Sequence, residues 1–299
     1  MAVRTAEQYL KSLKDGRVVY CLGEKVKDVT EHPFLKICAN WCAAYYVLAQ
    51  DPNYRDLFTA KNEEGELVSF NFLPIKTQQD LLRRRETVLA LARMCFGKPS
   101  GAQFTGVDGL NALTVVSKRV DKECGTNYAK NVESYRKYMQ KSDLTIALGM
   151  TDVKGDRSLR PSQQKPHQDY YVRIVDERSD GIIVRGAKAH ISHAPCNNEI
   201  LVLPCRAMRE DDKDYAVSFA IPANTKNVTM ISSEPEVKEP GNVLDYPIGA
   251  SIYLADCLLV FDDVFVPKDR IFLKREWPFA GQIAYMFGNF HRLSAETYK

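Results

Sequence analysis

The stretch from Met150 to Arg160 gathers hydroxyls, carboxylates, a glycine and basic side chains between an apolar run and a set of strands. Such groups need partners, because an unpaired polar group in an apolar core costs free energy. Thr151 and Ser158 could bind the polar edge of a planar ring, and Arg157 and Arg160 could neutralise a phosphate. The alternative is a charged linker between domains whose own charges form salt bridges with one another. The stretch has neither a GxGxxG pattern nor a Walker loop.

A second candidate surface is the end of the strand that runs from Lys188 to His193. Alternation along a strand would place Lys188, His190 and Ser192 on one face. That face could line a pocket in which His190 acts as an acid or base near neutral pH. The alternative is the polar outer face of a barrel strand. Two histidines three residues apart, with no matching cluster of ligands nearby in the sequence, make a poor metal site.

Cys38 and Cys42 are four residues apart and therefore share one face of a helix. They could ligate a metal, but no second pair follows at a useful spacing, so buried structural thiols are the favoured interpretation. All eight cysteines stand in apolar contexts, which fits reduced thiols better than a disulfide framework. Asp262 and Asp263 indicate a turn rather than a catalytic pair.

Composition limits the function classes. With 299 residues, 45% hydrophobic and 26% charged, the chain can bury a sizeable core in two moderate domains or one large one. The net charge of +3 is small, and residues 81–86 form only a short basic helix face, which we expect to be solvated, with nucleic acid a weak alternative. No run is long enough to span a bilayer, and residues 1–7 lack a signal-peptide core. We expect a cytoplasmic protein that binds neither membrane nor nucleic acid.

Apolar periodicity predicts a change from helices to strands along the chain. Helices are predicted over 5–15, 34–49, 77–97, 106–120, 127–141 and 279–299, a small hairpin over 18–26, and strands over 170–175, 182–190, 200–203, 215–221, 228–231, 257–261 and 264–267. Short strands at this spacing indicate a barrel or sandwich. The predicted class is α+β, with a helical domain at 1–142, a β domain at 143–276 and the start of a second helical domain at 277–299.

Several long blocks resemble one family of flavin enzymes. The blocks are 149–162, 184–190, 207–220 and 260–267, together with Phe279-Ala280-Gly281 and Phe290-His291-Arg292. They resemble the 4-hydroxybutyryl-CoA dehydratases of the wider 4-hydroxyphenylacetate 3-hydroxylase family. The resemblance implies the acyl-CoA dehydrogenase fold of helices, β barrel and helical bundle. Family chains continue through that bundle, so we expect a truncated member that lacks all but the first bundle helix and, with it, the usual tetramer contacts.

The resemblance also implies a bound FAD and a set of site residues. The residues expected at the flavin are Met150, Thr151, Asp152, Arg157, Ser158, Lys188, His190 and Ser192. The residues expected to be catalytic are His291, Asp256 and Lys299. Asp256 stands where the family has a glutamate, so its carboxyl is one methylene shorter.

The dehydratases hold a [4Fe–4S] cluster by three cysteines and a histidine. The resemblance places Ser100, Phe104 and Tyr298 at the cysteine positions and His291 at the histidine position. A cluster needs its thiolates, and Cys95 is out of register, so we expect no cluster and no other metal.

Three functions follow from the resemblance. The favoured one is an FAD-dependent enzyme of the 4-hydroxybutyryl-CoA dehydratase and vinylacetyl-CoA Δ-isomerase type, acting on a short acyl-CoA, with His291 as acid or base. The second is a monooxygenase that uses reduced flavin from a partner reductase to hydroxylate a phenol such as 4-hydroxyphenylacetate. The third is an inactive remnant. In either active case the cofactor does the chemistry and the protein places it.

Overall fold

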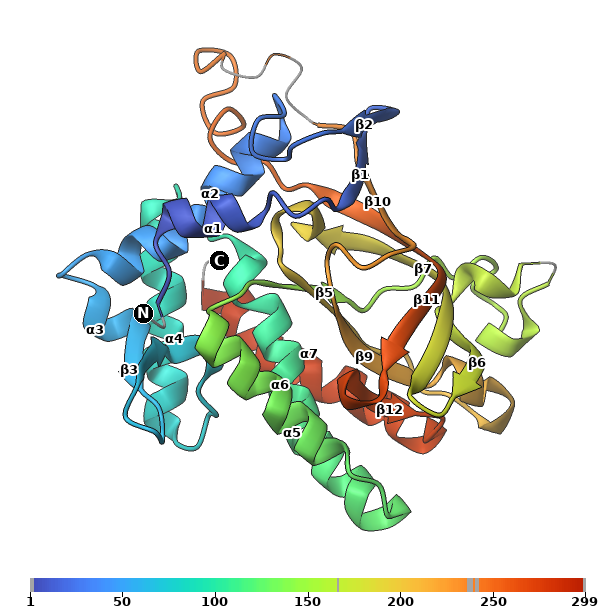
Figure 1. Cartoon of the computed structure of the whole chain (residues 1–299). Helices are drawn as coiled ribbons and strands as arrows, with labels where there is room; N and C mark the ends of the chain where they lie inside the picture. The colour runs from blue at the N-terminus through green and yellow to red at the C-terminus, as the bar shows by residue number, and fades with distance from the viewer. Residues whose placement is uncertain (1–2, 166, 236–238, 240–241, 298–299) are drawn as a thin grey trace.

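The computed structural model describes the chain apart from residues 1–2, 166, 236–238, 240–241 and 298–299, and apart from the side chains of 293–297. Helices gather on one side of the molecule and strands on the other (Figure 1). Among the described residues no helix is both long and apolar enough to cross a membrane.

The helical side consists of the predicted helices with two short additions. Its helices are α1 (Ala6–Ser12), α2 (Leu35–Gln50), α3 (Arg55–Phe58), α4 (Gln78–Met94), α5 (Thr105–Cys124) and α6 (Tyr128–Ser142), and a hairpin of β3 (Thr59–Lys61) and β4 (Leu67–Ser69) lies beside them. Thr5 and Thr77 cap α1 and α4, because each hydroxyl accepts from the backbone N–H three residues on. Most of α2 is apolar and buried, so this helix is the centre of the helical side.

Two sheets pack together on the other side. The larger has the order β2-β1-β10-β11-β7-β6 and the smaller the order β12-β9-β8-β5. Their strands are β1 (Val18–Cys21), β2 (Glu24–Val26), β5 (Ile146–Gly149), β6 (Arg173–Arg178), β7 (Gly181–Ser192), β8 (Glu199–Val202), β9 (Val217–Pro222), β10 (Val228–Ser232), β11 (Asp256–Pro267) and β12 (Ile271–Lys274). The rings of Phe219 and Phe261 meet edge to face, 5.9 Å apart, between the two sheets. The predicted α+β class with a barrel-like or sandwich β part is confirmed.

The predicted hairpin at residues 18–26 has a role that its sequence did not indicate. Its first strand, β1, pairs in parallel with β10 and thereby extends the larger sheet. This segment of the N-terminal region therefore belongs to the β layer, because its backbone hydrogen bonds are made there. The proposed domain boundaries at 142/143 and 276/277 stay predictions.

Asp262 and Asp263 do not form the predicted turn. They lie in a bulge within β11, where the register with β7 shifts between Phe261 and Val264, and Asp263 takes φ 56°. Arg185 on β7 donates two hydrogen bonds of 2.8 Å to the Asp263 carboxylate. The bulge exists because an extra residue on one strand can be accommodated only by bending it.

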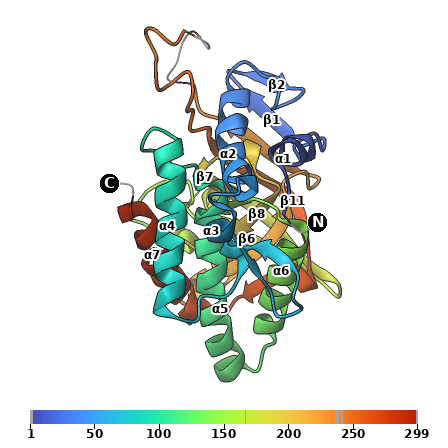
Figure 2. The same ribbon diagram turned by 90° about the vertical axis from the view of Figure 1, so that its left-hand side faces the viewer.

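The last helix joins the two sides. α7 (Ala280–Thr297) packs against α5 and α4 (Figure 2). α5 in turn packs on β5, and Gly106 is required there, because a Cβ would lie 2.4 Å from Cβ of Ile146. α7, which carries His291, is thus held against β5 through α5.

Candidate active site

The structure brings the two predicted flavin segments into direct contact. The N–H of Ala189 donates to the carbonyl oxygen of Thr151 over 2.8 Å. Nζ of Lys188 lies 2.9 Å from Oδ1 of Asp152 and donates to the carbonyl oxygens of Met150 and Leu203, each at 2.9 Å. Backbone and side-chain bonds together hold these segments side by side.

Asp152 and Lys188 have a structural part in this arrangement. Their side chains are only 3% and 2% exposed, and Asp152 also accepts from the N–H of Val172. Removing one charge would leave the other buried without its counter-charge, which is costly. In contrast, the hydroxyl of the half-buried Thr151 and the ring of the exposed His190 have no hydrogen-bond partner among the described residues. These two side chains remain available to a ligand.

The prediction that Lys188, His190 and Ser192 share a face is wrong. The register between β7 and β11 shifts between Cys257 and Leu259, and His190 takes φ 56°. A bulge breaks the alternation of side chains. Lys188 therefore points into the core, while His190 is exposed.

Ser192 and Asp256 form a pair at the ends of β7 and β11. The hydroxyl of Ser192 donates to Oδ1 of Asp256 over 2.6 Å, and the two residues are register partners. Both are half-buried. The Asp256 carboxyl is thereby oriented at the sheet end that also carries His190.

The loop after Thr151 has mixed exposure. Arg157 and Ser158 are exposed, and the Ser158 hydroxyl donates to Asp156. Arg160 instead donates to the buried carboxylate of Asp212. Burial opposes ionisation of that carboxyl, but hydrogen bonds from Ser162, the Arg209 backbone and Arg160 lower its pKa. Arg160 therefore anchors the loop, whereas Arg157 is exposed and available to a phosphate.

His291 on α7 is held by a buried carboxylate. Its Nδ1 lies 3.0 Å from Oδ2 of Asp108, and Oδ1 of Asp108 accepts from Arg84 over 2.5 Å. The side chains of Asp108 and Arg84 are 0% and 2% exposed, whereas that of His291 is 31% exposed. The His291 ring also stacks on Phe287. A carboxylate at Nδ1 orients the ring and leaves Nε2 for acid–base chemistry.

The sequence predicted His291 but not its partners. Arg84 belongs to residues 81–86, which were expected to form a solvated face; the structure shows that this interpretation is wrong for Arg84. The only signal was a carboxylate, Asp108, in the first turn of an apolar helix. Predicted catalytic Lys299, with Tyr298, lies outside the described residues.

The residues at the expected cluster positions do not fit an iron–sulfur cluster. Ser100 donates through its hydroxyl to Sγ of Cys42 at 3.2 Å, and the buried ring of Phe104 lies edge-on to Tyr45. Neither side chain offers a thiolate, and Nδ1 of His291 is taken by Asp108. We therefore derive no step through a cluster.

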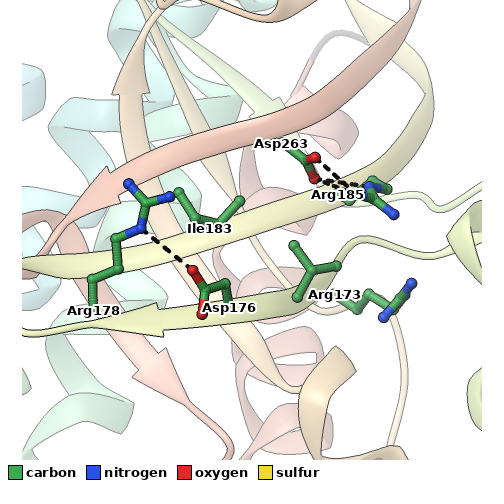
Figure 3. Close-up of a pocket in the computed structure, with 7 residues that line it drawn as sticks. Arg173, Asp176, Arg178, Ile183, Arg185 and Asp263 are labelled. Carbon is green, nitrogen blue, oxygen red and sulfur yellow. Dashed lines mark hydrogen bonds and ion pairs between the residues drawn. The ribbon is translucent and has the colours of Figure 1, made fainter.

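A hollow of about 400 Å³ lies on the outer face of β6 and β7 (Figure 3). Its cations have carboxylate partners: Arg185 pairs with Asp263, and Arg178 with Asp176. None of the predicted site residues lines it. Its charges are satisfied on the surface, so we do not assign it to the active site.

Comparison with known proteins places these features in context. A family model described as "4-hydroxyphenylacetate 3-hydroxylase N terminal" matches residues 5–273. The chain is 41% identical, over 97% of its length, to a 4-hydroxybutyryl-CoA dehydratase/vinylacetyl-CoA-Δ-isomerase of Clostridium aminobutyricum. It is 32% identical, over 90% of its length, to the oxygenase component of a 4-hydroxyphenylacetate 3-monooxygenase of Thermus thermophilus. It spans 60% and 54% of these two proteins.

Solved structures agree. An oxygen-tolerant archaeal 4-hydroxybutyryl-CoA dehydratase from N. maritimus superimposes with a TM-score of 0.92 at 30% identity, covering 99% of this chain and 60% of that one. The oxygenase component of a 4-hydroxyphenylacetate 3-monooxygenase in complex with FAD superimposes with a TM-score of 0.87 at 28% identity, again over 99% and 60%.

Proposed function

We propose that this chain, which belongs to the 4-hydroxyphenylacetate 3-hydroxylase family, is part of an FAD-dependent enzyme. The proposed enzyme moves protons on a short acyl-CoA. The identity of 41% to a dehydratase/isomerase supports this branch over the monooxygenase branch, where the identity quoted above is 32%. The chain spans about 60% of the dehydratases that it matches, so the activity of the whole enzyme is part of the proposal.

The observation that carries this proposal is the contact between His291 and Asp108. With its Nδ1–H donated to a buried carboxylate, the imidazole keeps a lone pair on Nε2. In a vinylacetyl thioester, Nε2 takes a proton from C2 and a proton is returned at C4, so that the double bond moves into conjugation. Asp108 stabilises the imidazolium formed in between, and Arg84 balances the charge of Asp108.

The flavin would lie against the joined segments around Thr151 and His190. Thr151 and His190 offer the donors that the fold leaves unused, Met150 offers an apolar contact, and Arg157 and Ser158 are exposed for a phosphate. The Asp152–Lys188 ion pair keeps the segments in register. When bound, FAD supplies an electron-accepting ring beside the substrate.

The side chains at the expected cluster positions favour isomerisation over loss of water. Loss of water from a 4-hydroxyacyl thioester needs an acid for the departing hydroxide, and Ser100 and Phe104 supply no metal ligand for one. A proton shift has no such requirement. The proposed reaction is therefore the isomerase reaction of this branch.

The lack of thiolates at the cluster positions also favours a second candidate function. Phenol hydroxylation by reduced flavin needs no thiolates at these positions, and a structure of that branch with FAD superimposes closely. This candidate needs dioxygen and a partner that reduces the flavin.

One pair of assays separates the candidates. The chain with FAD and without oxygen is given vinylacetyl-CoA, and crotonyl-CoA formation is followed. In parallel, the chain with FADH₂ and oxygen is given 4-hydroxyphenylacetate. Anaerobic isomerisation supports the proposal, oxygen-dependent hydroxylation supports the alternative, and a chain that binds no flavin and catalyses neither reaction contradicts both.

A further inference from the structure

We propose that Cys38, Cys42, Cys196 and His193 bind a single soft metal ion of the Zn²⁺ class, at a site separate from the active site. Donor atoms of Cys38, Cys42 and His193 all lie within 4.8 Å of one another. Cys196 is not in that group of three, but its thiol adjoins those of Cys38 and Cys42 and would complete the set. Three sulfurs and an imidazole nitrogen are a donor set that zinc prefers.

The donors come from two elements that are far apart in the sequence. Cys38 and Cys42 stand one turn apart on α2, while His193 precedes the turn Ala194–Cys196 after β7 and Cys196 ends it. His193 is left-handed, with φ 60°, and this conformation costs free energy for a residue with a Cβ. The backbone thus departs from the strand at the residue whose ring meets the thiols.

The imidazole of His193 has a ring nitrogen without a hydrogen-bond partner among the described residues. His193 is 3% exposed, and its Nε2 has no hydrogen-bond partner in the described part of the chain. Its ring lies against Trp41, with centroids 4.8 Å apart, and faces Gly101 on another side. A buried nitrogen without a partner is destabilising, and a metal ion would supply the missing bond.

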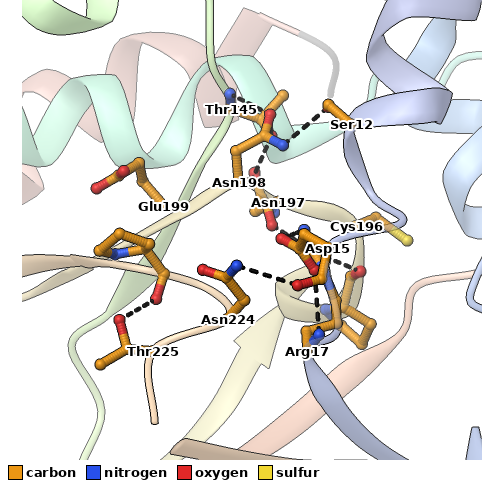
Figure 4. Close-up of polar contacts among 12 residues, drawn as sticks. Ser12, Asp15, Arg17, Thr145, Cys196, Asn197, Asn198, Glu199, Asn224 and Thr225 are labelled. Atoms are coloured by element: carbon orange, nitrogen blue, oxygen red, sulfur yellow. Dashed lines mark hydrogen bonds and ion pairs between the residues drawn. The ribbon is translucent and has the colours of Figure 1, made fainter.

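The turn that carries two of the donors is rigidly supported. Arg17, itself buried, donates to the carbonyl oxygens of Pro195 and Asn197 over 2.9 and 2.5 Å, and Asp15 holds its guanidinium (Figure 4). The hydroxyl of Tyr9 donates to the carbonyl oxygen of Cys196 over 2.6 Å. Preorganised donors favour metal binding because little order is lost on binding. The positive charge of Arg17 also acts on the Cys196 thiol and would offset the charge of the thiolates.

The spacing of the donors selects a mononuclear ion. Sulfurs bound to one tetrahedral Zn²⁺ at roughly 2.3 Å are about 3.8 Å apart, so the donor atoms of Cys38, Cys42 and His193 need only a small contraction, and the thiol of Cys196 would move in to complete the tetrahedron. A four-iron cluster would hold its thiolates farther apart than 4.8 Å. The site is also distinct from the cluster positions Ser100 and Phe104, although the Ser100 hydroxyl touches Cys42.

The test uses Co²⁺ as a spectroscopic replacement for Zn²⁺, added to the reduced full chain. We expect about one equivalent of Co²⁺ to bind, with intense tetrahedral d–d bands and a thiolate charge-transfer band, both removed by added Zn²⁺. Cys42→Ser and His193→Gln are expected to lose or strongly weaken these bands. Cys257→Ala, which removes an equally buried thiol in the β part, is the matched control and is expected to keep them.

The unmodified chain decides the question even where a variant fails to fold. No thiolate band with Co²⁺, or octahedral bands only, would overturn the proposal. So would unchanged binding by folded Cys42→Ser and His193→Gln, or a loss with Cys257→Ala equal to theirs. Because the readout is metal binding, it is independent of flavin and of activity.

Discussion

Nδ1 of His291 lies 3.0 Å from Oδ2 of Asp108, although 183 positions separate the two residues. The contact joins α7 to the first turn of α5 and holds an imidazole that is 31% exposed. A catalytic base needs this combination of a fixed ring and an accessible nitrogen.

Replacing this imidazole should remove the reaction without unfolding the chain. For His291→Gln we expect the isomerase rate to fall by about 10²–10⁴-fold, because the amide cannot accept the proton. The melting temperature should change little, since the side chain is 31% exposed. Arg292→Gln, at an exposed neighbour, is the control and should keep the rate. A His291→Gln rate within a few-fold of the original would exclude His291 as the base.

The ion pair behind His291 should matter for stability. Arg84→Met removes the buried guanidinium that donates to Asp108, so we expect a loss of about 3–5 kcal/mol in the free energy of unfolding, measured by urea denaturation. The adjacent Arg85 is exposed, and Arg85→Met should cost less than about 0.5 kcal/mol. Equal losses of unfolding free energy for the two substitutions would show that the buried Arg84–Asp108 ion pair does not stabilise the fold.

The pair that joins the flavin segments can be tested by a double-mutant cycle. Lys188→Met and Asp152→Leu should each destabilise the chain by about 3–5 kcal/mol, and the double variant by clearly less than their sum, because it leaves no lone buried charge. Arg185→Met with Asp263→Leu, an exposed pair that joins β7 to β11, should show a coupling of about 1 kcal/mol or less. Additive effects at Lys188 and Asp152 would contradict the assignment.

Stability should depend on pH through Asp143. Burial raises the pKa of this carboxyl to about 6, partly offset by the N–H and charge of Arg4. The folded-state pKa lies above the unfolded value of roughly 4. The contribution of Asp143 to the free energy of unfolding is therefore fully present below a pH of roughly 4, and it is lost as the pH rises through about 6. Relative to Asp143→Asn, the free energy of unfolding should fall by on the order of 2–3 kcal/mol between those values. A difference in unfolding free energy between the original chain and Asp143→Asn that does not change with pH would contradict this prediction.

Periodicity predicted most helices and strands, since each pattern reflects which face of an element is buried. It missed β5 and β12, which are short and buried, and it could not show that β1 pairs with β10, a strand about 200 residues later in the chain. Such pairing is a property of the fold rather than of the local sequence.

The site was predictable only in part. The resemblance identified His291 and the Thr151 and His190 segments, but alternation failed at His190 because a bulge cannot be read from side-chain types. Asp108 and Arg84 were missed because a charged residue on an amphipathic helix is ordinarily solvated. Cys38 and Cys42 seemed to lack partners because His193 and Cys196 follow only after some 150 residues.

The most direct test of the account is hydrogen–deuterium exchange of the chain with and without FAD. If the flavin lies against the joined segments, peptides that contain Met150–Ser158 and Lys188–Ser192 should both be protected by FAD, while those on the outer face of β6 should not change. FAD that fails to bind, or that binds and protects neither segment, would contradict the account.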